Sequence, residues 1–206
     1  MIYMLLEYMK AKKLLEKYGI ASIESAYINN VDELKEFVDK NQNIVLKAIS
    51  EKALHKSKSG LVMLNLNKEN AISRYNELLK KAKAYAPFKI LAQKMASPGI
   101  EVIIGGREDA QFGKLILIGL GGVFVEAFKD FSLRICPINR YDAEKMLIEL
   151  RSKDVITYNG KASKTLINLL LKVSKMLEEN NIKELDMNPI IIRENGYDAV
   201  DLRIIE

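Results

Sequence analysis

The order of apolar runs in residues 23–95 constrains the fold of this chain more than any other feature. Two short β-rich runs, NIVLKAIS and LVMLNL, lie between helical stretches at about 31–40 and 68–84. With further strands at about 25–28 and in FKILAQKM, the segment is expected to run β-α-β-β-α-β. This is the split β-α-β, ferredoxin-like order, in which two helices back a compact sheet.

Residues 96–206 are expected to form a second lobe, because Ala96-Ser97-Pro98-Gly99 is a turn-rich break. The runs IEVIIGG, KLILIGLG and VFVEAFKDFSLRICPI predict antiparallel strands, helices follow at 141–151 and 161–179, and a last hairpin turns at Asn195-Gly196. We therefore expect an α+β protein of two lobes: an amphipathic N-terminal helix (about 6–18) with a lid lobe in 1–95, and a larger lobe of mixed and antiparallel sheet in 96–206.

Composition narrows the class of protein. The chain has 206 residues, of which 49% are hydrophobic and 29% charged, as in ordinary globular proteins. No apolar run has the roughly 18 residues of a membrane helix, and the amphipathic N-terminus carries Glu7 and Lys10, unlike a signal peptide. The single cysteine, Cys136, excludes an internal disulfide and a cysteine-based zinc site. A cytoplasmic protein is expected, with no membrane partner.

Charge is distributed unevenly along the chain. Lys and Arg outnumber Asp and Glu by 17 to 10 in residues 1–94, whereas residues 95–206 hold 15 against 17. A basic half and a mildly acidic half suit an anionic ligand with a metal cation. Nucleic acid is not the expected partner, because neither an arginine cluster nor an aromatic ladder is present.

Two basic residues of the first half are candidates for phosphate chemistry. Lys47 lies inside the apolar run NIVLKAIS, where a lysine either meets an anion such as phosphate or faces solvent on a half-exposed strand. His55, the only histidine, lies in SEKALHKSKSG, whose lysines, serines and glycine can cradle phosphate. An imidazole nitrogen can also accept a phosphoryl group covalently. A solvated loop histidine without a role is the alternative.

Carboxylates and an amide of the second half are candidates for a metal site. Asp186 and Asn188 alternate in one strand and so share a face, and Asp201 is expected in the next strand. These are hard oxygen ligands that suit Mg²⁺, although a polar edge-strand face would look the same. Glu101 and Glu126 either bind sugar hydroxyls or a metal, or are surface carboxylates.

Several of these segments together resemble the nucleotide-binding β subunit of ADP-forming acetyl-CoA synthetases. This subunit is an ATP-grasp protein of the NDP-forming acyl-CoA synthetase family, related to the succinyl-CoA synthetase β chain. The resemblance spans almost the whole chain, and its most specific motifs are IVLK…HKS, GLGGVFVEAFKD and ELDMNP. It implies a two-lobed ATP-grasp fold and the reaction acyl-CoA + ADP + phosphate ⇌ carboxylic acid + CoA + ATP.

The resemblance also implies roles for individual residues, with ATP or ADP and Mg²⁺ as cofactors. Lys47 would contact the phosphates, Gln93, Lys94 and Met95 would hold adenine through backbone groups, Glu101 would bind ribose, and Asn188 and Asp201 would ligate Mg²⁺. His55 would be transiently phosphorylated and Asp186 would orient or activate it. The partner would be a CoA-binding α subunit in an α2β2 assembly.

One departure from the family pattern follows the histidine, where HKSKSGLV replaces a sequence close to HKSDVGGV. Lys58 replaces an acid, Ser59 an apolar residue and Leu61 the second glycine, which adds charge and removes backbone freedom. Two other functions therefore remain alternatives: an ATP-grasp ligase that needs no phosphohistidine, and a nucleotide-binding regulatory module.

Overall fold

The computed structural model describes residues 4–50, 52, 60–122 and 130–206. They form two compact units, which we name by size: the small unit is Ile23–Ala96, and the large unit joins Met1–Ser22 to Ser97–Glu206. The break after Ala96 lies next to the expected lobe boundary. The N-terminal helix differs from expectation, because it belongs to the large unit and not to the lid lobe.

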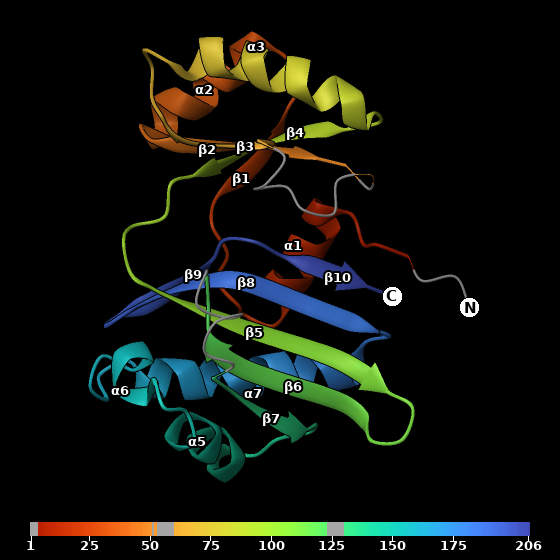
Figure 1. The fold of residues 1–206 in the computed structure, drawn as a ribbon, viewed down its shortest axis with the longest axis vertical. Helices are drawn as coiled ribbons and strands as arrows, with labels where there is room; N and C mark the ends of the chain where they lie inside the picture. The colour runs from red at the N-terminus through yellow and green to blue at the C-terminus, as the bar shows by residue number, and fades with distance from the viewer. Residues whose placement is uncertain (1–3, 51, 53–59, 123–129) are drawn as a thin grey trace. The chain divides into compact units, whose positions relative to one another are not determined.

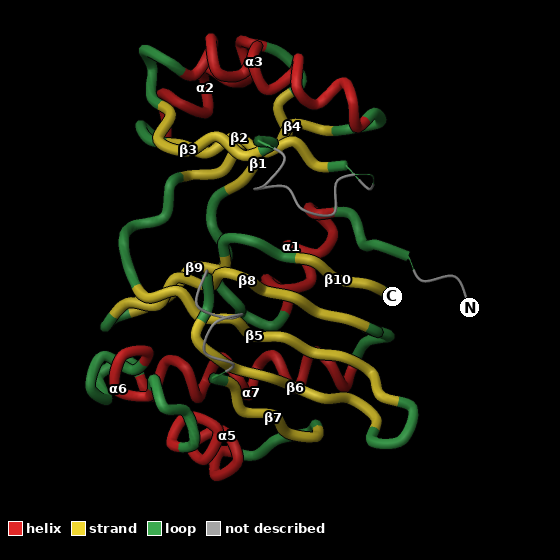
Figure 2. The backbone as a smooth tube through the Cα atoms, viewed as in Figure 1, coloured by secondary structure: helices red, strands yellow, loops and turns green. Residues whose placement is uncertain are grey.

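The small unit is a sheet with helices on one face (Figures 1 and 2). Its strands lie in the order β1-β4-β2-β3, and every neighbouring pair is antiparallel. Each helix thus joins two parallel strands that have a third strand between them, as the split β-α-β order predicts. The elements are β1 (Ser25–Ile28), α2 (Val31–Asn41), β2 (Ile44–Ile49), β3 (Val62–Leu66), α3 (Ala71–Ala82), the 3₁₀ turn η1 (Lys83–Tyr85) and β4 (Lys89–Lys94).

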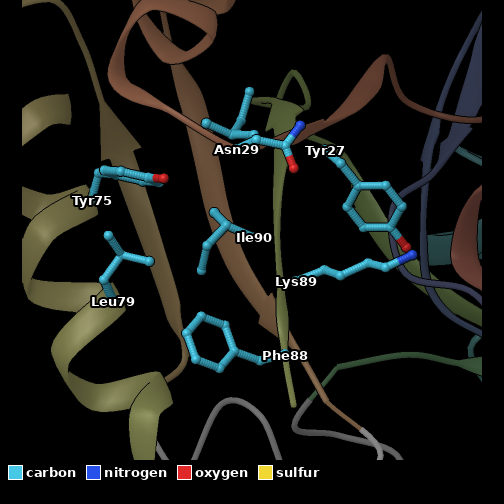
Figure 3. Close-up of a pocket in the computed structure, with 8 residues that line it drawn as sticks. Tyr27, Asn29, Tyr75, Leu79, Phe88, Lys89 and Ile90 are labelled. Carbon is cyan, nitrogen blue, oxygen red and sulfur yellow. The ribbon is translucent and has the colours of Figure 1, made fainter. Parts of the chain in front are cut away.

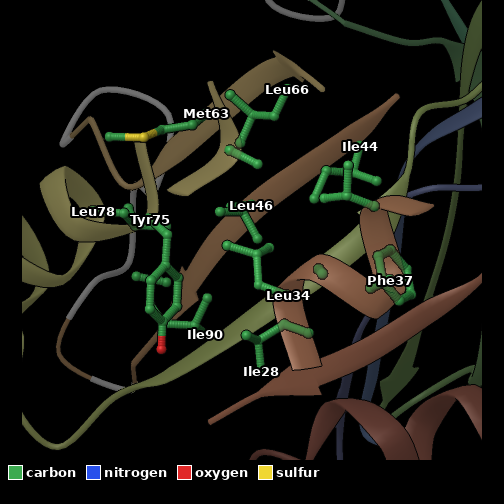
Figure 4. Packing of buried hydrophobic residues seen from close by; sticks show 14 of the residues in the cluster. Ile28, Leu34, Phe37, Ile44, Leu46, Met63, Leu66, Tyr75, Leu78 and Ile90 are labelled. Carbon is green, nitrogen blue, oxygen red and sulfur yellow. The ribbon is translucent and has the colours of Figure 1, made fainter. Parts of the chain in front are cut away.

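Alternation along the strands decides which side chains meet the helices. On β2, Ile44, Leu46 and Ala48 join the apolar core beneath α2 and α3, so Val45 and Lys47 point to the other face (Figure 4). The chain enters α2 through Asn30, whose side chain accepts hydrogen bonds from the Asp32 and Glu33 N–H groups. Burial of this cluster holds the small unit together.

The large unit is built on a 6-stranded antiparallel sheet in the order β10-β8-β5-β6-β7, with β9 paired to β8. Its strands are β5 (Ile100–Asp109), β6 (Gly113–Leu120), β7 (Phe131–Ile135), β8 (Glu184–Arg193), β9 (Gly196–Ala199) and β10 (Arg203–Ile205). Its helices are α1 (Tyr8–Lys17), α5 (Arg140–Ile148), α6 (Lys153–Ile156) and α7 (Ser163–Glu179). The short α6 was not expected from the sequence.

One face of this sheet packs on α7. The other carries polar side chains on β8 and apolar ones, Leu117 and Leu133 among them, on β6 and β7. A Cβ at Gly106 would come within 2.7 Å of Leu177 of α7, so the α7 face includes residue 106 and its cross-strand neighbour Leu185. Leu185 and Met187 are buried, whereas Asp186 and Asn188 are partly exposed on the opposite face. We call this opposite side the open face of the large unit.

The N-terminal helix joins the large unit through hydrogen bonds that the sequence does not reveal. Met4 and Leu6 donate backbone hydrogen bonds to Glu206 and Ile204, which adds the N-terminal segment beside β10. The Tyr18 hydroxyl donates to Glu179 at the end of α7, at 2.9 Å. These contacts link opposite ends of the chain, so local periodicity could not predict them. No helix among the described residues is long and apolar enough to cross a membrane.

Candidate functional site

A β-bulge in β8 positions Asn188. Residues Met187 and Ile190 of β8 pair with Ile104 and Val102 of β5, so β8 contributes one extra residue between the two pairs. The bulge contains the cis peptide bond between Asn188 and Pro189. Alternation after the buried Met187 puts Asn188 on the side away from α7, and the bulge, a feature often found beside functional sites, includes it.

The same bulge anchors Asp201. The carbonyl oxygen of Pro189 accepts hydrogen bonds from the Val200 N–H at 3.1 Å and the Asp201 N–H at 3.5 Å. The sequence placed Asp201 in a strand, and this is wrong: it lies in the connection between β9 and β10. Its Oδ1 accepts a hydrogen bond from the Leu202 N–H, at 3.1 Å, which fixes the carboxylate within the connection.

Asp186 lies on the open face near this connection. Burial raises the pKa of its carboxyl above the ordinary value, the Asp201 carboxylate raises it further, and Arg203 opposes the rise. Its Oδ1 is buried and has no hydrogen-bond partner among the residues that the structure describes. A buried oxygen of this kind can bind a cation or accept a hydrogen bond from a group such as an imidazole N–H.

The oxygens near the β8 bulge fit a magnesium ion that is also held by a ligand. Asn188 offers an amide oxygen and Asp201 a carboxylate, both hard donors of the kind Mg²⁺ prefers. Within the described ranges, no three His, Cys, Asp or Glu side chains are grouped to hold a metal by themselves. The donor set therefore suits Mg²⁺ that takes its remaining ligands from phosphate oxygens and water.

Glu101 is held beside a glycine-rich turn after β6. The Gly121 N–H donates to the Glu101 carbonyl oxygen at 2.7 Å, and a Cβ at Gly121 would collide with Val102 backbone atoms at 2.8 Å. Gly122 has φ +67°, and a Cβ there would lie 2.0 Å from Oε2 of Glu101. Only glycines permit this close approach, which sets the direction of an otherwise exposed carboxylate.

Asp130 secures the far end of the same motif. Its carboxylate accepts hydrogen bonds from the backbone N–H groups of Arg151 at 3.0 Å and Ser152 at 2.8 Å. Burial acts to raise the pKa of Asp130, but the hydrogen bonds from these N–H groups and the charge of Arg151 lower it overall. Asp130 closes the GLGGVFVEAFKD motif, but no role for it was expected from the sequence.

Lys47 lies in the middle of the small-unit sheet. Its neighbours across the sheet are Leu91 and Val62, and its side chain is only 5% exposed, on the face away from α2 and α3. The alternative of a lysine on a solvent-facing strand is therefore excluded. A largely buried ammonium on a sheet is suited to bind an anionic group, because charge pairing is stronger where water is scarce.

Gln93, Lys94 and Met95 end β4 and lead out of the small unit. The Gln93 side chain is 1% exposed and donates to Ser25 Oγ at 3.2 Å. The N–H groups of Lys94 and Met95 donate to the carbonyl oxygens of Glu24 and Asn43, both at 2.9 Å. Since these N–H groups are already bonded, an adenine that used them would have to replace those hydrogen bonds.

His55 lies outside the described residues, as do Lys58, Ser59 and Glu126. The segment around His55 returns to the described part at Gly60 and Leu61. Leu61 is 0% exposed, belongs to the apolar core of the small unit, and accepts a hydrogen bond from the Ala48 N–H at 2.9 Å. The residue that departs from the family glycine is thus a core anchor next to β2.

A hollow of about 220 Å³ in the small unit contains none of the predicted site residues (Figure 3). Tyr75, Leu79 and Phe88 line one side of it, and Lys89 lies over the Tyr27 ring at 4.7 Å from the centroid. Its lining combines these apolar side chains with the polar Asn29 and the cationic Lys89.

The chain is similar to a family of known proteins over almost its whole length. The ATP-grasp domain family matches residues 3–205. The chain is 37% identical to the β subunit of ADP-forming acetate–CoA ligase II of Pyrococcus furiosus, over 95% of this chain and 89% of the relative. The chain belongs to the ATP-grasp family of ADP-forming acetate–CoA ligase β subunits.

A longer relative and two solved structures are also similar to this chain. ADP-forming acetate–CoA ligase I of Archaeoglobus fulgidus is 35% identical over 93% of this chain, which spans 29% of that longer protein. Acetyl-coenzyme A synthetase 1 of Candidatus Korarchaeum cryptofilum, in complex with coenzyme A and Ca-AMPCP, superposes with a TM-score of 0.88 at 34% identity over 98% of this chain and 93% of that one. A second structure of that enzyme, with Mg-AMPPCP and a phosphohistidine segment pointing towards the nucleotide site, has a TM-score of 0.83, again at 34% identity over 98% of this chain and 92% of that one. The expected ATP-grasp fold and family are confirmed.

Proposed function

We propose that this protein is the nucleotide-binding subunit of an ADP-forming acyl-CoA (acetate–CoA) ligase. It transfers phosphoryl between a histidine and ADP, so that with its partner it catalyses acyl-CoA + ADP + phosphate ⇌ carboxylic acid + CoA + ATP. Two β subunits of ADP-forming acetate–CoA ligases are over 30% identical to this chain over 95% of its length, and this supports the reaction class.

Individual residues are assigned roles in nucleotide binding. In the small unit, Lys47 binds phosphate, and Gln93, Lys94 and Met95 contact adenine. In the large unit, Glu101 binds ribose, and Asn188 and Asp201 ligate the Mg²⁺ that neutralises the phosphates. The cation and the lysine supply the charge neutralisation on which phosphoryl transfer mostly depends.

The transfer step itself is assigned to His55 and Asp186. Towards ATP, the N–P bond of phosphohistidine breaks while a P–O bond forms to the terminal phosphate oxygen of ADP, and the imidazole nitrogen regains a lone pair. Asp186 accepts a hydrogen bond from the other imidazole N–H and so orients the ring, a role for which a buried carboxylate oxygen without a partner is suited.

The observation that carries the proposal is the arrangement of oxygen donors at the β8 bulge. Asp201 hydrogen-bonds to Pro189, the neighbour of Asn188, and its carboxylate raises the pKa of Asp186. A metal site beside a partly buried carboxylate is what in-line transfer between a nucleotide and an imidazole requires. A polar edge-strand surface alone would not need a bulge to bring the groups together.

The partner is proposed to be a CoA-binding α subunit, in an α2β2 assembly in the cytoplasm. The Pyrococcus relatives are named as β subunits, and the Archaeoglobus relatives are single chains more than three times as long. The part of the enzyme that handles CoA and the acyl group would therefore reside in this partner.

The decisive experiment measures phosphohistidine on this chain. Incubation with [γ-³²P]ATP and Mg²⁺, with the partner subunit added in a second arm, is expected to give an acid-labile, base-stable label on the wild type and none on His55→Ala. Uptake of label by His55→Ala would refute the shuttle. ATP binding with no label in either arm would indicate a regulatory module, and ligase activity that survives His55→Asn would indicate a different ATP-grasp ligase.

A further inference from the structure

Four residues form one row across the open face of the large unit. Arg203 of β10 is opposite Asp186 of β8, Asp186 is opposite Gly105 of β5, and Gly105 is opposite Leu117 of β6. Side chains that are opposite each other in an antiparallel sheet share a face, with Cβ atoms about 5 Å apart. Arg203 and the gap at Gly105 therefore flank Asp186 on its two sides.

Arg203 is an exposed cation that lies beside Asp186 without pairing to it. It makes no hydrogen bond and no ion pair with any residue in the described part of the chain, although it lies next to Asp186. An arginine used for stability would be expected to pair with a carboxylate or cap a carbonyl. This guanidinium is instead available to a ligand that approaches the open face.

Gly105 leaves room on the other side of Asp186. A Cβ at this position would meet Leu185 O at 3.6 Å and Leu117 at 4.0 Å, which are ordinary contacts. Neither backbone conformation nor packing therefore requires glycine here, in contrast to Gly106, where a Cβ would press on Leu177 at 2.7 Å. The missing side chain opens space directly beside the Asp186 carboxylate.

We propose that Arg203 binds the oxygens of the phosphoryl group that is exchanged beside Asp186, and that Gly105 provides the space for it. The inference rests on the proposed function and adds a residue to it. A guanidinium matches phosphate oxygens with two parallel hydrogen bonds, which a lysine cannot do.

Charge explains why this position needs a cation. Asp186 and Asp201 are both carboxylates, and a phosphoryl group that approaches them is itself doubly negative. Mg²⁺ at Asn188 and Asp201 would neutralise the phosphates of the nucleotide. Arg203 is a separate cation, next to Asp186 on the side away from Gly105. It would offset the repulsion where the phosphoryl group meets Asp186 and hold the group in a reactive orientation.

The test compares Arg203→Gln with a matched control, Arg107→Gln. Arg107 is also exposed and lies in the next row of the same face, opposite Glu184, so both variants lose one exposed guanidinium from one sheet face. The rate of phosphohistidine labelling from ATP and the Kd for ATP are measured for both. Arg203→Gln is expected to label about 100-fold more slowly with unchanged Kd and thermal midpoint, whereas Arg107→Gln stays at the wild-type rate.

Two further variants test the guanidinium of Arg203 and the space at Gly105 separately. Arg203→Lys is expected to recover only part of the rate, and added guanidinium ion to rescue Arg203→Gln but not Arg203→Lys. Gly105→Ala is expected to slow labelling while Kd for ATP and stability stay unchanged, since its Cβ fits without strain. Either of two results would overturn the inference. Arg203→Gln could be labelled at the wild-type rate, or its slower labelling could come from a weakened affinity for ATP.

A binding measurement keeps the inference separate from the proposed function. Inorganic phosphate is titrated into the full chain and followed by the amide NMR signals of Gly105 and Asp186. Saturable shifts are expected in the wild type and Arg107→Gln and none in Arg203→Gln. If the wild type takes no label, the proposed function fails while this titration still decides the site: equal shifts in all three proteins refute it.

Discussion

The carboxylate of Glu101 lies against the backbone of Gly122, where a Cβ would be 2.0 Å from Oε2. With φ +67°, Gly122 also has a backbone conformation that other residues rarely adopt. The GLGG turn therefore limits where the Glu101 carboxylate can point. If Glu101 binds ribose, the turn is part of the nucleotide site although it need not touch the nucleotide.

Gly122→Ala is expected to weaken ATP binding by roughly 10- to 100-fold, the loss of one hydrogen bond to a charged group. The added methyl group displaces the carboxylate from its position. Isothermal titration of ATP measures the effect, with Gly196→Ala as the control because no atom lies within 4 Å of a Cβ there. An unchanged Kd in Gly122→Ala would contradict the role of the turn.

Lys47→Met is expected to abolish most of the stabilisation that ATP gives to the protein. The apolar stem is kept, but the buried ammonium that would contact phosphate is lost, which costs roughly 10- to 100-fold in Kd. The shift of the thermal midpoint with ATP measures this. Lys68→Met is the control, since Lys68 is exposed and pairs with Asp39 at 2.8 Å. A full ATP-dependent shift in Lys47→Met would exclude Lys47 from the site.

The stability of the large unit is expected to depend on pH through Glu108. Hydrogen bonds and charge attraction from Lys114, at 2.6 Å, and Lys183, at 2.8 Å, lower the pKa of Glu108 from 4.5 to about 2. A depressed carboxyl pKa contributes stability that is complete above the unfolded-state pKa and is lost as the pH falls from about 4.5 to about 2.

Denaturation curves between pH 7 and pH 2 compare wild type with Glu108→Gln. The variant should be less stable near neutral pH, and the difference should shrink as the pH falls through this window. Glu144→Gln, which removes an exposed pair with Arg140, is the control and should run parallel to wild type. A difference that grows on acidification would have the wrong sign and would refute the linkage.

Local patterns predicted most elements of this fold, because alternation and helical periodicity reflect burial of nearby residues. Thus Lys47 was correctly placed in an apolar strand, and Asp186 and Asn188 on one face. Contacts between distant segments were not predictable in this way. The segment before the first helix pairs with β10, and the Asp201 N–H bonds to the Pro189 carbonyl oxygen. Arg203 lies opposite Asp186 only because β10 pairs with β8.

Leu61 has a different role in the structure from the one that the sequence indicated. From the sequence it was a departure that replaced a family glycine and reduced backbone freedom near His55. In the structure its side chain is fully buried in the small-unit core, while the positive φ of +66° is at the preceding Gly60. The substitution therefore adds apolar burial at the point where the segment rejoins the sheet.

Leu61→Ala is expected to lower the free energy of unfolding by about 2–5 kcal/mol, the usual cost of a cavity at a fully buried leucine. Leu64→Ala is the matched control: Leu64 lies nearby in β3, is 56% exposed, and should change stability by less than about 0.5 kcal/mol. Urea denaturation measures both. Equal, small effects in the two variants would show that Leu61 does not anchor this end of the segment. If Leu61→Ala is destabilised as expected, its rate of His55 labelling tests whether the anchor affects phosphoryl transfer.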